Sequence, residues 1–312
     1  MESAQRSFGQ IHFGNVSLGD LRRNRRLPQL VDAMVKHPGG TLPEKFSRSA
    51  DLDAFYHLCS VDDVTHAAVL GSHRAGVLQK LQTTRKFLLV VHDGTELDFS
   101  SHESLQNLGQ IGNGNGRGYI AHNSLVVDPQ QGAVLGLANQ ILHVRETVPE
   151  NEGVAAKRAR ESRESLLWIK GTEGLPKNRK VVDVCDRGAD TFEFLEHAVQ
   201  SGRTFVVRSC YDRVMLPGHV GDAAERGSLH AYARTLPAQA TSTATVRLDL
   251  DVLKQRRQAK REGSTEPIAT YREAQLCMSA APVRLVAPHV RRGNHGKSPL
   301  KVWIIRIWEP TT

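Results

Sequence analysis

Two aspartates in this 312-residue sequence stand where side chains often perform chemistry, directly after short apolar runs. Asp93 follows the run Phe87–Val91 and His92, and Asp186 follows Val181–Cys185. Runs of this length predict strands that are buried on both faces. Carboxylates at the ends of neighbouring strands can converge on one point, and two such carboxylates are costly together unless a cation neutralises them.

The pair therefore predicts a divalent metal site. Mg²⁺ is the expected ion, with Mn²⁺ as a substitute, because Mg²⁺ combines a few carboxylates with waters and phosphate oxygens. Two ions about 3.5–4 Å apart would activate an attacking oxygen and stabilise a leaving oxygen at a phosphodiester. The alternative is that Asp93 and Asp186 are strand-end caps or turn formers, since aspartate is common at such positions.

The overall charge favours a polyanionic partner. Lys and Arg number 41 against 33 Asp and Glu, which gives a net charge of +8, and basic side chains gain affinity by releasing phosphate counterions. The four cysteines form no C-x-x-C pair, which argues against structural zinc and disulfides. No signal peptide or membrane-length apolar run is present. We expect a soluble cytoplasmic protein, with neither a membrane nor a small molecule as its partner.

The elements that must position the aspartates form an α/β pattern. Residues 13–81 predict amphipathic helices, one following Leu18–Asp20 and kinked or split at Pro28, and another beginning after Ser60 as its N-cap. The pattern changes at Lys86. Strands are predicted at residues 87–91, 120–127, 133–144, 181–185 and 204–208, with a hairpin loop at 128–132 and helices at 150–170 and 191–199. This order indicates a mixed sheet flanked by helices.

Other segments have less distinct patterns. Gly112–Gly118 predicts a flexible loop, because it lacks the strand, loop and helix context of a phosphate-binding loop. Further strands are predicted at residues 245–250, 274–285 and 301–308, and residues 254–261 predict a basic linker. By strand alternation His92 should point away from Asp93 and pack in the core.

Several segments resemble the cut-and-paste transposases of bacterial insertion sequences, in the insertion-sequence-four group that includes the transposon-five transposase. Leu18–Leu27 is similar to the family's N-terminal signature, and Ala54–Leu58 to its A-x-Y-R-F/H-L segment, with histidine replacing the usual arginine. Leu89–Thr95 is similar to the strand bearing the first catalytic aspartate. Val182–Asp190 matches the element bearing the second, and Phe205–Ser209 matches the strand after it. The resemblance covers nearly the whole chain.

The resemblance implies a DDE-type enzyme with a ribonuclease-H-like core, two metals at Asp93 and Asp186, and attack by water or a 3′ hydroxyl on DNA phosphates. It also implies a DNA-binding N-terminal domain, a β-rich insertion, and binding of transposon inverted repeats as a homodimer. The expected location is the bacterial cytoplasm, at the nucleoid. The expected domains are a helical DNA-binding domain at residues 1–82, the catalytic core at 83–210, the insertion at 211–299 and the last core strand at 300–312.

Arginines are the expected DNA contacts. Four arginines follow Asp20: Arg22, Arg23, Arg25 and Arg26. Given the resemblance, we expect them to contact DNA phosphates from one surface of a helix. The alternative is a solvated helix face. Arg208 is a further candidate for the DNA backbone, with an ion pair to Asp186 or Asp190 as the alternative. Asp190 itself is predicted in the first turn of the following helix, where a carboxylate is favoured.

The family's third metal ligand is a glutamate in a Y-x-x-R-x-x-x-E-x-x-x-x-x-x-K helix after the last core strand. Tyr271–Glu273 has the wrong spacing for this pattern, and Glu309 is expected to be a surface residue. The sequence therefore predicts a truncated transposase with impaired cutting, for which a monomer is plausible because the family's C-terminal region helps dimerise. The alternatives are a non-catalytic DNA-binding protein that occupies ends or inhibits full-length copies, and a basic metal-dependent nuclease unrelated to transposition.

Overall fold

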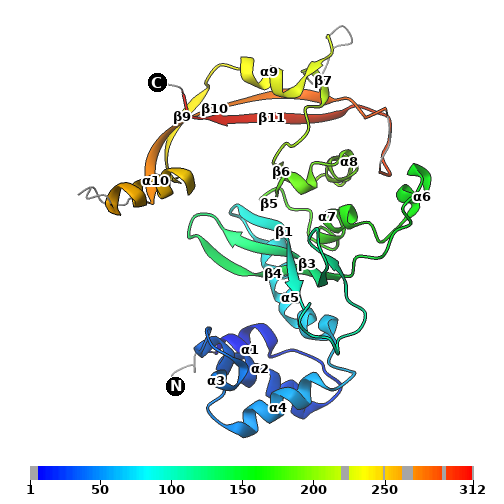
Figure 1. Ribbon diagram of the computed structural model, residues 1–312, viewed down its shortest axis with the longest axis vertical. Coiled ribbons are helices and arrows are strands. Elements are labelled where there is room, and N and C mark those ends of the chain that lie inside the picture. Colours follow the sequence, from blue (N-terminus) through cyan, green and yellow to red (C-terminus); the bar gives the residue numbers. More distant parts are fainter. Residues whose placement is uncertain (1–5, 219–224, 249, 262–269, 290–292, 311–312) are drawn as a thin grey trace. The chain divides into compact units, whose positions relative to one another are not determined.

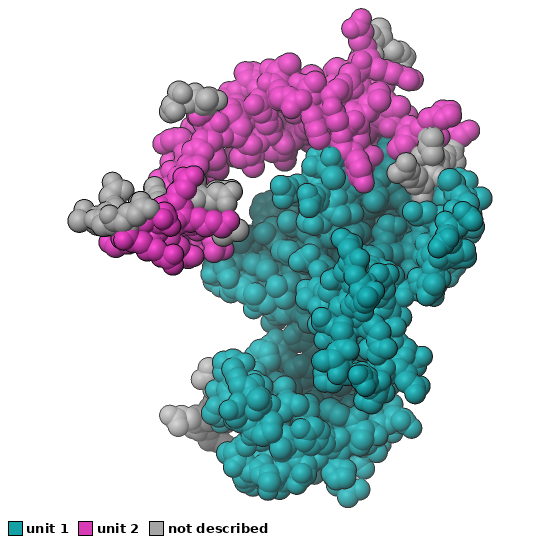
Figure 2. Space-filling model, in the orientation of Figure 1, with its two compact units in different colours: residues 1–210, 291–294 teal, residues 211–290, 295–312 magenta. Residues whose placement is uncertain are grey.

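The computed structural model describes residues 6–218, 225–248, 250–261, 270–289 and 293–310. The chain divides into two compact units, one of residues 1–210 and 291–294 and one of residues 211–290 and 295–312 (Figure 2). Across these described segments, the first unit contains a six-stranded sheet and the second a five-stranded sheet. The expectation of an α/β protein with a mixed sheet is confirmed.

Four helices begin the first unit (Figure 1): α1 (Phe8–Phe13), α2 (Leu21–Lys36), α3 (Leu42–Lys45) and α4 (Ser49–Cys59). Asp20 caps α2 by accepting a hydrogen bond from the Arg22 amide at 2.7 Å, as the loop before it suggested. Pro28 lies inside α2 and does not split it. The helices enclose a small apolar core of Val16, Leu18, Leu27, Leu30, Phe46 and Leu58.

Helix α5 (His66–Thr83) connects these helices to the sheet and covers one of its faces (Figure 1). Its N-cap is Thr65, so the predicted start after Ser60 is wrong, and Ser60 instead ends α4. On the same helix His73 Nε2 accepts a hydrogen bond from the Leu137 amide at 2.8 Å, and its Nδ1 lies 3.0 Å from His12 Nδ1 of α1. The N-terminal helices are thus linked to the sheet by direct contacts.

The first sheet consists of β1 (Leu88–Asp98), β2 (Gly109–Ile111), β3 (Gly116–Asp128), β4 (Ala133–His143), β5 (Val181–Cys185) and β6 (Thr204–Val207). The order is β2-β3-β1-β5-β6, with β4 also paired to β3. β1 runs antiparallel to β3 and parallel to β5, and β5 runs parallel to β6. The mixture arises because hairpins join the first strands, whereas helical crossovers precede β5 and β6.

The glycine-rich segment is the turn of a hairpin between β2 and β3. The predicted loop is therefore correct for residues 112–115 and wrong for Gly116–Gly118, which begin β3. Gly112 has a φ of 60° at the turn, which glycine adopts without steric cost. A Cβ on Gly118 would lie 1.9 Å from the Leu97 carbonyl oxygen. Glycine is required here by close strand packing.

Helices complete the first unit between its parallel strands. The connection from β4 to β5 contains α6 (Val154–Ala159), η1 (Glu164–Leu166) and α7 (Leu167–Gly171), and the connection from β5 to β6 contains η2 (Arg187–Ala189) and α8 (Phe192–Gln200). Phe194 of α8 packs with Cys185 and Ala189, and Trp168 of α7 joins this cluster. This cluster includes Cys185 and Val207, the last residues of β5 and β6.

The second unit contains β7 (Val214–Pro217), β8 (Gly227–Ser228), α9 (Leu229–Thr235), β9 (Ala240–Arg247), α10 (Leu250–Arg261), β10 (Tyr271–Leu285) and β11 (Leu300–Trp308). The strand order is β11-β10-β7-β8, with β9 also paired to β10. The predicted basic linker lies within α10, so that prediction is wrong. Leu, Lys, Gln, Arg and Ala dominate the segment, and all are strong helix formers. Figure 1 shows α10 at the end of the β9–β10 ribbon.

The last strand differs from its expected place in the core. β11 pairs antiparallel with β10 from Cys277↔Trp308 to Leu285↔Leu300, which places it in the sheet of the second unit. β10 is 15 residues long and offers a partner for the whole of β11. Over the residues that the structure describes, no helix has the length and apolar character needed to cross a bilayer.

Candidate metal site and DNA-binding region

Asp93 and Asp186 directly follow the last paired residues of two adjacent parallel strands, Asp93 within β1 and Asp186 just after β5 ends. β1 pairs with β5 from Leu88↔Val181 to His92↔Cys185, and the next register step on each strand is an aspartate. Residues in matched register on parallel strands share a face of the sheet, and neighbouring strands lie about 4.8 Å apart. Both aspartates are exposed. The two aspartates therefore follow neighbouring paired residues at the point where β5 ends, while β1 continues to Asp98.

Each aspartate uses one carboxylate oxygen locally. Asp93 Oδ1 accepts a hydrogen bond from the Gly94 amide at 2.9 Å, and Asp186 Oδ1 accepts one from the Gly188 amide at 2.7 Å. Neither carboxylate forms an ion pair with a basic side chain of the described segments. The local bonds orient the two groups and leave the other oxygen of each open to a cation.

This donor set fits a hard divalent cation, which takes carboxylate oxygens and completes its shell with water and phosphate oxygens. Among the described residues, no group of three or more His, Cys, Asp or Glu side chains is arranged to hold a metal ion. A cation at Asp93 and Asp186 would therefore rely on water and substrate oxygens for most of its ligands.

A set of buried polar side chains lies near the aspartates, with His92 one residue before Asp93 and Asp183 three residues before Asp186. We call Ser124, His92, Asp183 and Arg203 the buried polar bridge. His92 Nε2 donates to Asp183 Oδ1 at 3.0 Å, and His92 Nδ1 lies 3.0 Å from Ser124 Oγ. Ser124 Oγ donates to the Gly171 carbonyl at 3.0 Å. Arg203 donates to both oxygens of Asp183, from Nη2 at 2.8 Å and from Nε.

The buried polar bridge keeps a charge inside the sheet. The Asp183 side chain is 1% exposed and that of Arg203 is 6% exposed. Burial alone would raise the pKa of Asp183, but hydrogen bonds from His92 and Arg203 outweigh it and lower that pKa below its ordinary value. Asp183 thus stays ionised and bound to both partners at neutral pH.

Sequence reasoning found the packing of His92 but missed its partners. His92 is buried, as alternation predicted. The signal for the rest was Asp183, a carboxylate at an inward position of an otherwise apolar strand. Such a residue requires a buried partner, but the sequence does not indicate that the partner is Arg203.

The four arginines of α2 that were predicted to contact DNA fall into two groups. Arg23 Nη1 donates to the Leu18 carbonyl at 2.8 Å and to Asp63 at 3.0 Å, and Arg26 forms an ion pair with Asp51. Arg22 and Arg25 are exposed, and Arg22 lies 3.5 Å from Asp20 at the helix start. Arg23 and Arg26 therefore hold the helices together, whereas Arg22 and Arg25 present their charge to solvent.

Arg208 does not form either of the alternative ion pairs within the described segments. Arg208 is exposed, and its backbone amide donates to the Cys185 carbonyl at 3.1 Å. Within the described segments its side chain forms no ion pair with Asp186 or Asp190. Asp190 is buried, accepts from the Cys210 amide at 2.7 Å and precedes the N-cap Thr191. Its predicted position in the first turn of α8 is therefore wrong.

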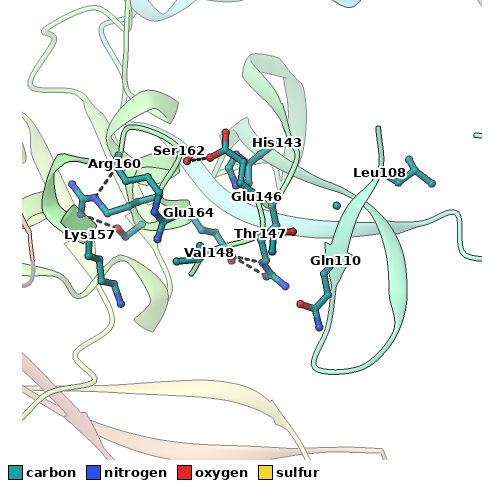
Figure 3. Close-up of a pocket in the computed structure, with 14 residues that line it drawn as sticks. Leu108, Gln110, His143, Glu146, Thr147, Val148, Lys157, Arg160, Ser162 and Glu164 are labelled. Atoms are coloured by element: carbon teal, nitrogen blue, oxygen red, sulfur yellow. Dashed lines mark hydrogen bonds and ion pairs between the residues drawn. The ribbon is translucent and has the colours of Figure 1, made fainter. Parts of the chain in front are cut away.

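A second candidate is a cavity of about 610 Å³ between β2, the end of β4 and the segment around α6 (Figure 3). Most of its charged side chains already bind one another or neighbouring groups. Arg145 pairs with Glu164, and Arg160 pairs with Glu152. Figure 3 shows Ser162 bonded to Glu146 across the same wall. This internal pairing gives the cavity little free charge to recognise a ligand.

A comparison with protein families identifies the N-terminal region. Residues 5–64 match the family described as Transposase DNA-binding. The match spans α1 to α4 and includes the capped start of α2 with its exposed Arg22 and Arg25. Residues 5–64 are therefore a transposase DNA-binding region, which supports a transposase that binds DNA.

Proposed function

We propose that this chain is a cut-and-paste DNA transposase, similar to the insertion-sequence-four group. It binds the inverted repeats of its element through residues 5–64 and carries metal-dependent phosphodiester chemistry at Asp93 and Asp186. The observation that carries the catalytic part is that both aspartates directly follow His92↔Cys185, the last registered pair of β1 and β5. The observation behind the DNA-binding part is the family match of the N-terminal region.

The strand order supports a ribonuclease-H-like core. The long antiparallel strands β4, β3 and β1 are followed across the sheet by the parallel strands β5 and β6. The two aspartates follow the paired segment of β1 and β5, the neighbouring strands in the middle of this order. Two acidic groups at adjacent central strands are suited to a cation that contacts a substrate above the sheet end.

The chain's own residues would hold and orient the reacting groups. A bound pair of Mg²⁺ ions would stabilise the attacking and leaving oxygens of the scissile phosphate. Asp93 and Asp186 would hold this pair through their open oxygens, while the amides of Gly94 and Gly188 fix the carboxylate orientations. Arg208, exposed next to the Cys185 strand end, would contact the DNA backbone.

A second candidate is a transposase that binds ends without cutting them. It is favoured because no third carboxylate joins the two aspartates within the described segments. Glu309 binds Arg272 of β10 through both carboxylate oxygens and belongs to the second unit. Such a protein would occupy transposon ends or inhibit copies of the transposase that cut.

A plasmid assay separates these functions. Supercoiled plasmid carrying the element's inverted repeats is incubated with the full chain and Mg²⁺ or Mn²⁺, beside a plasmid without the repeats. We expect repeat-specific binding and metal-dependent nicking that Asp93→Asn and Asp186→Asn abolish and that the exposed control Glu173→Gln retains.

Each other outcome has a defined meaning. Repeat-specific binding without nicking would support the second candidate. Nicking of both plasmids without specific binding would indicate a basic nuclease unrelated to transposition. Cutting that survives both aspartate variants would overturn the proposed metal site.

A further inference from the structure

Backbone hydrogen bonding between β1 and β5 stops one residue short of the two aspartates. The last paired residues are His92 and Cys185. Beyond them β1 continues only against β3, while β5 ends and the chain turns into η2. No registered β1–β5 pair therefore fixes the separation between Asp93 and Asp186 themselves.

The buried polar bridge spans the same strands directly beneath this gap. Its members come from adjacent elements in sheet order: Ser124 from β3, His92 from β1, Asp183 from β5, and Arg203 from the residue before β6. Ser124 also binds the Gly171 carbonyl of α7. A side-chain connection thus joins three strands, the residue before a fourth and a covering helix near the point where the backbone ladder ends.

The geometry points to a positioning function. We propose that the buried polar bridge sets the spacing of Asp93 and Asp186 for divalent-cation binding, with His92, Asp183 and Arg203 as positioning residues. This inference rests on the proposed metal site. His92 immediately precedes Asp93, so a displaced imidazole moves the backbone that carries that carboxylate. Asp183 fixes β5 in the same way three residues before Asp186.

A second buried ion pair in the same unit supplies a matched control. Arg163 donates to both carboxylate oxygens of Glu193 at 2.9 Å, and both side chains are buried. This pair joins the segment before η1 to α8, and neither residue belongs to β1 or β5. Asp183→Asn and Glu193→Gln therefore make the same chemical change, carboxylate to amide opposite a buried arginine, at two distances from the aspartates.

The test measures binding of Mn²⁺ alone to the full chain, by the electron paramagnetic resonance signal of free Mn²⁺. Measurements are made well below the unfolding midpoint of every variant. We expect Asp93→Asn to abolish the site and Asp183→Asn to weaken Mn²⁺ binding about tenfold, as loss of supporting groups around metal ligands does. Glu193→Gln should lower the unfolding midpoint similarly and leave the Mn²⁺ dissociation constant within about twofold.

The outcomes separate the inference from the function on which it rests. Wild-type protein that binds no Mn²⁺ through Asp93 would overturn the proposed metal site and this inference with it. Wild-type binding with equal Mn²⁺ affinity in Asp183→Asn and Glu193→Gln would overturn the inference alone. If Asp183→Asn does not fold, Ser124→Ala replaces it, because this variant removes only the hydroxyl between His92 and Gly171. Unchanged Mn²⁺ affinity in Ser124→Ala would then overturn the inference.

Discussion

The Asp183 carboxylate and the Arg203 guanidinium form a two-point ion pair inside the first unit, where both side chains are almost completely excluded from solvent. Such a pair is costly to break from one side, because the remaining charge is left buried without its partner. Its position between β5 and β6 makes it a structural connection as well as an electrostatic one.

Removal of the arginine alone should destabilise the protein strongly. Arg203→Met leaves the Asp183 carboxylate with only His92 as a partner, and we expect the free energy of unfolding to fall by about 3–5 kcal/mol. Urea denaturation monitored by tryptophan fluorescence measures this loss. The double variant Arg203→Met/Asp183→Leu should recover much of it, because no buried charge remains. A single variant as stable as wild type would contradict the importance of the pair.

His122 should make stability fall in mild acid. Burial, aided by the charge of nearby His92, lowers the pKa of His122 to about 4 from an ordinary value of 6.5. Between these values the unfolded chain binds a proton that the folded chain excludes, so stability is present above pH 6.5 and is lost towards pH 4. The loss attributable to this group is about 3 kcal/mol.

The measurement compares urea unfolding at pH 7.5 and pH 5 for wild type and His122→Phe. Phenylalanine preserves an aromatic ring beside Trp168, whose ring centroid lies 5.0 Å from that of His122, and it removes the titrating group. The variant should show a smaller decrease in stability between the two pH values. An equal decrease in both proteins would show that His122 does not cause the pH dependence.

Exposed and paired arginines of α2 should behave differently in DNA binding. Arg22→Ala/Arg25→Ala should weaken binding to the terminal repeat without lowering the unfolding midpoint. It should also reduce the slope of log K against log salt by about 0.9 per lost phosphate contact. Fluorescence anisotropy at several salt concentrations measures both quantities.

Arg26→Ala is the contrasting variant, because it leaves Asp51 without its contact to α2. We expect it to lower the unfolding midpoint. The proposed roles would be contradicted by the opposite result. In that case Arg26→Ala would weaken DNA binding without loss of stability, and Arg22→Ala/Arg25→Ala would leave DNA binding unchanged.

Gly171 should not tolerate a side chain. A Cβ at this position would lie 2.7 Å from His122 Nε2 and 3.1 Å from His92 Nδ1. Overpacking of this kind costs about 1–3 kcal/mol, so Gly171→Ala should lower the unfolding midpoint. The control is Gly76→Ala in α5, where a Cβ meets nothing within 4 Å and alanine should add about 0.5–1 kcal/mol of stability. Equal behaviour of the two variants would contradict this interpretation.

The strands that carry the aspartates could be predicted because their apolar runs are distinctive. The helix boundaries were harder, since Ser60 and Thr65 are both suitable N-caps and only tertiary packing selects Thr65. α10 was misread because its charge suggested a solvated linker, although its residues favour a helix. Local composition therefore indicated the α/β class better than the limits of each element.

The candidate site depends on pairings that no local pattern contains. The sequence indicated two strand-end aspartates. This is correct for Asp186, but Asp93 lies inside β1, which continues to Asp98. The positions of the two aspartates on neighbouring strands follow from the alignment of β1 with β5. The arginines of α2 illustrate the same limit, because Arg23 pairs with an aspartate 40 residues away and Arg26 with one 25 residues away. Neither partner can be identified from helix periodicity alone.

The contact between His12 and His73 has a mechanical consequence. The Leu137 amide donates to His73 Nε2, so in a neutral ring Nδ1 carries the proton that is shared with His12. Burial lowers the pKa of both histidines, which favours the uncharged rings that this contact needs. At neutral pH this hydrogen bond therefore joins the N-terminal helices to the sheet. It would loosen on acidification, when two like charges would face each other across it.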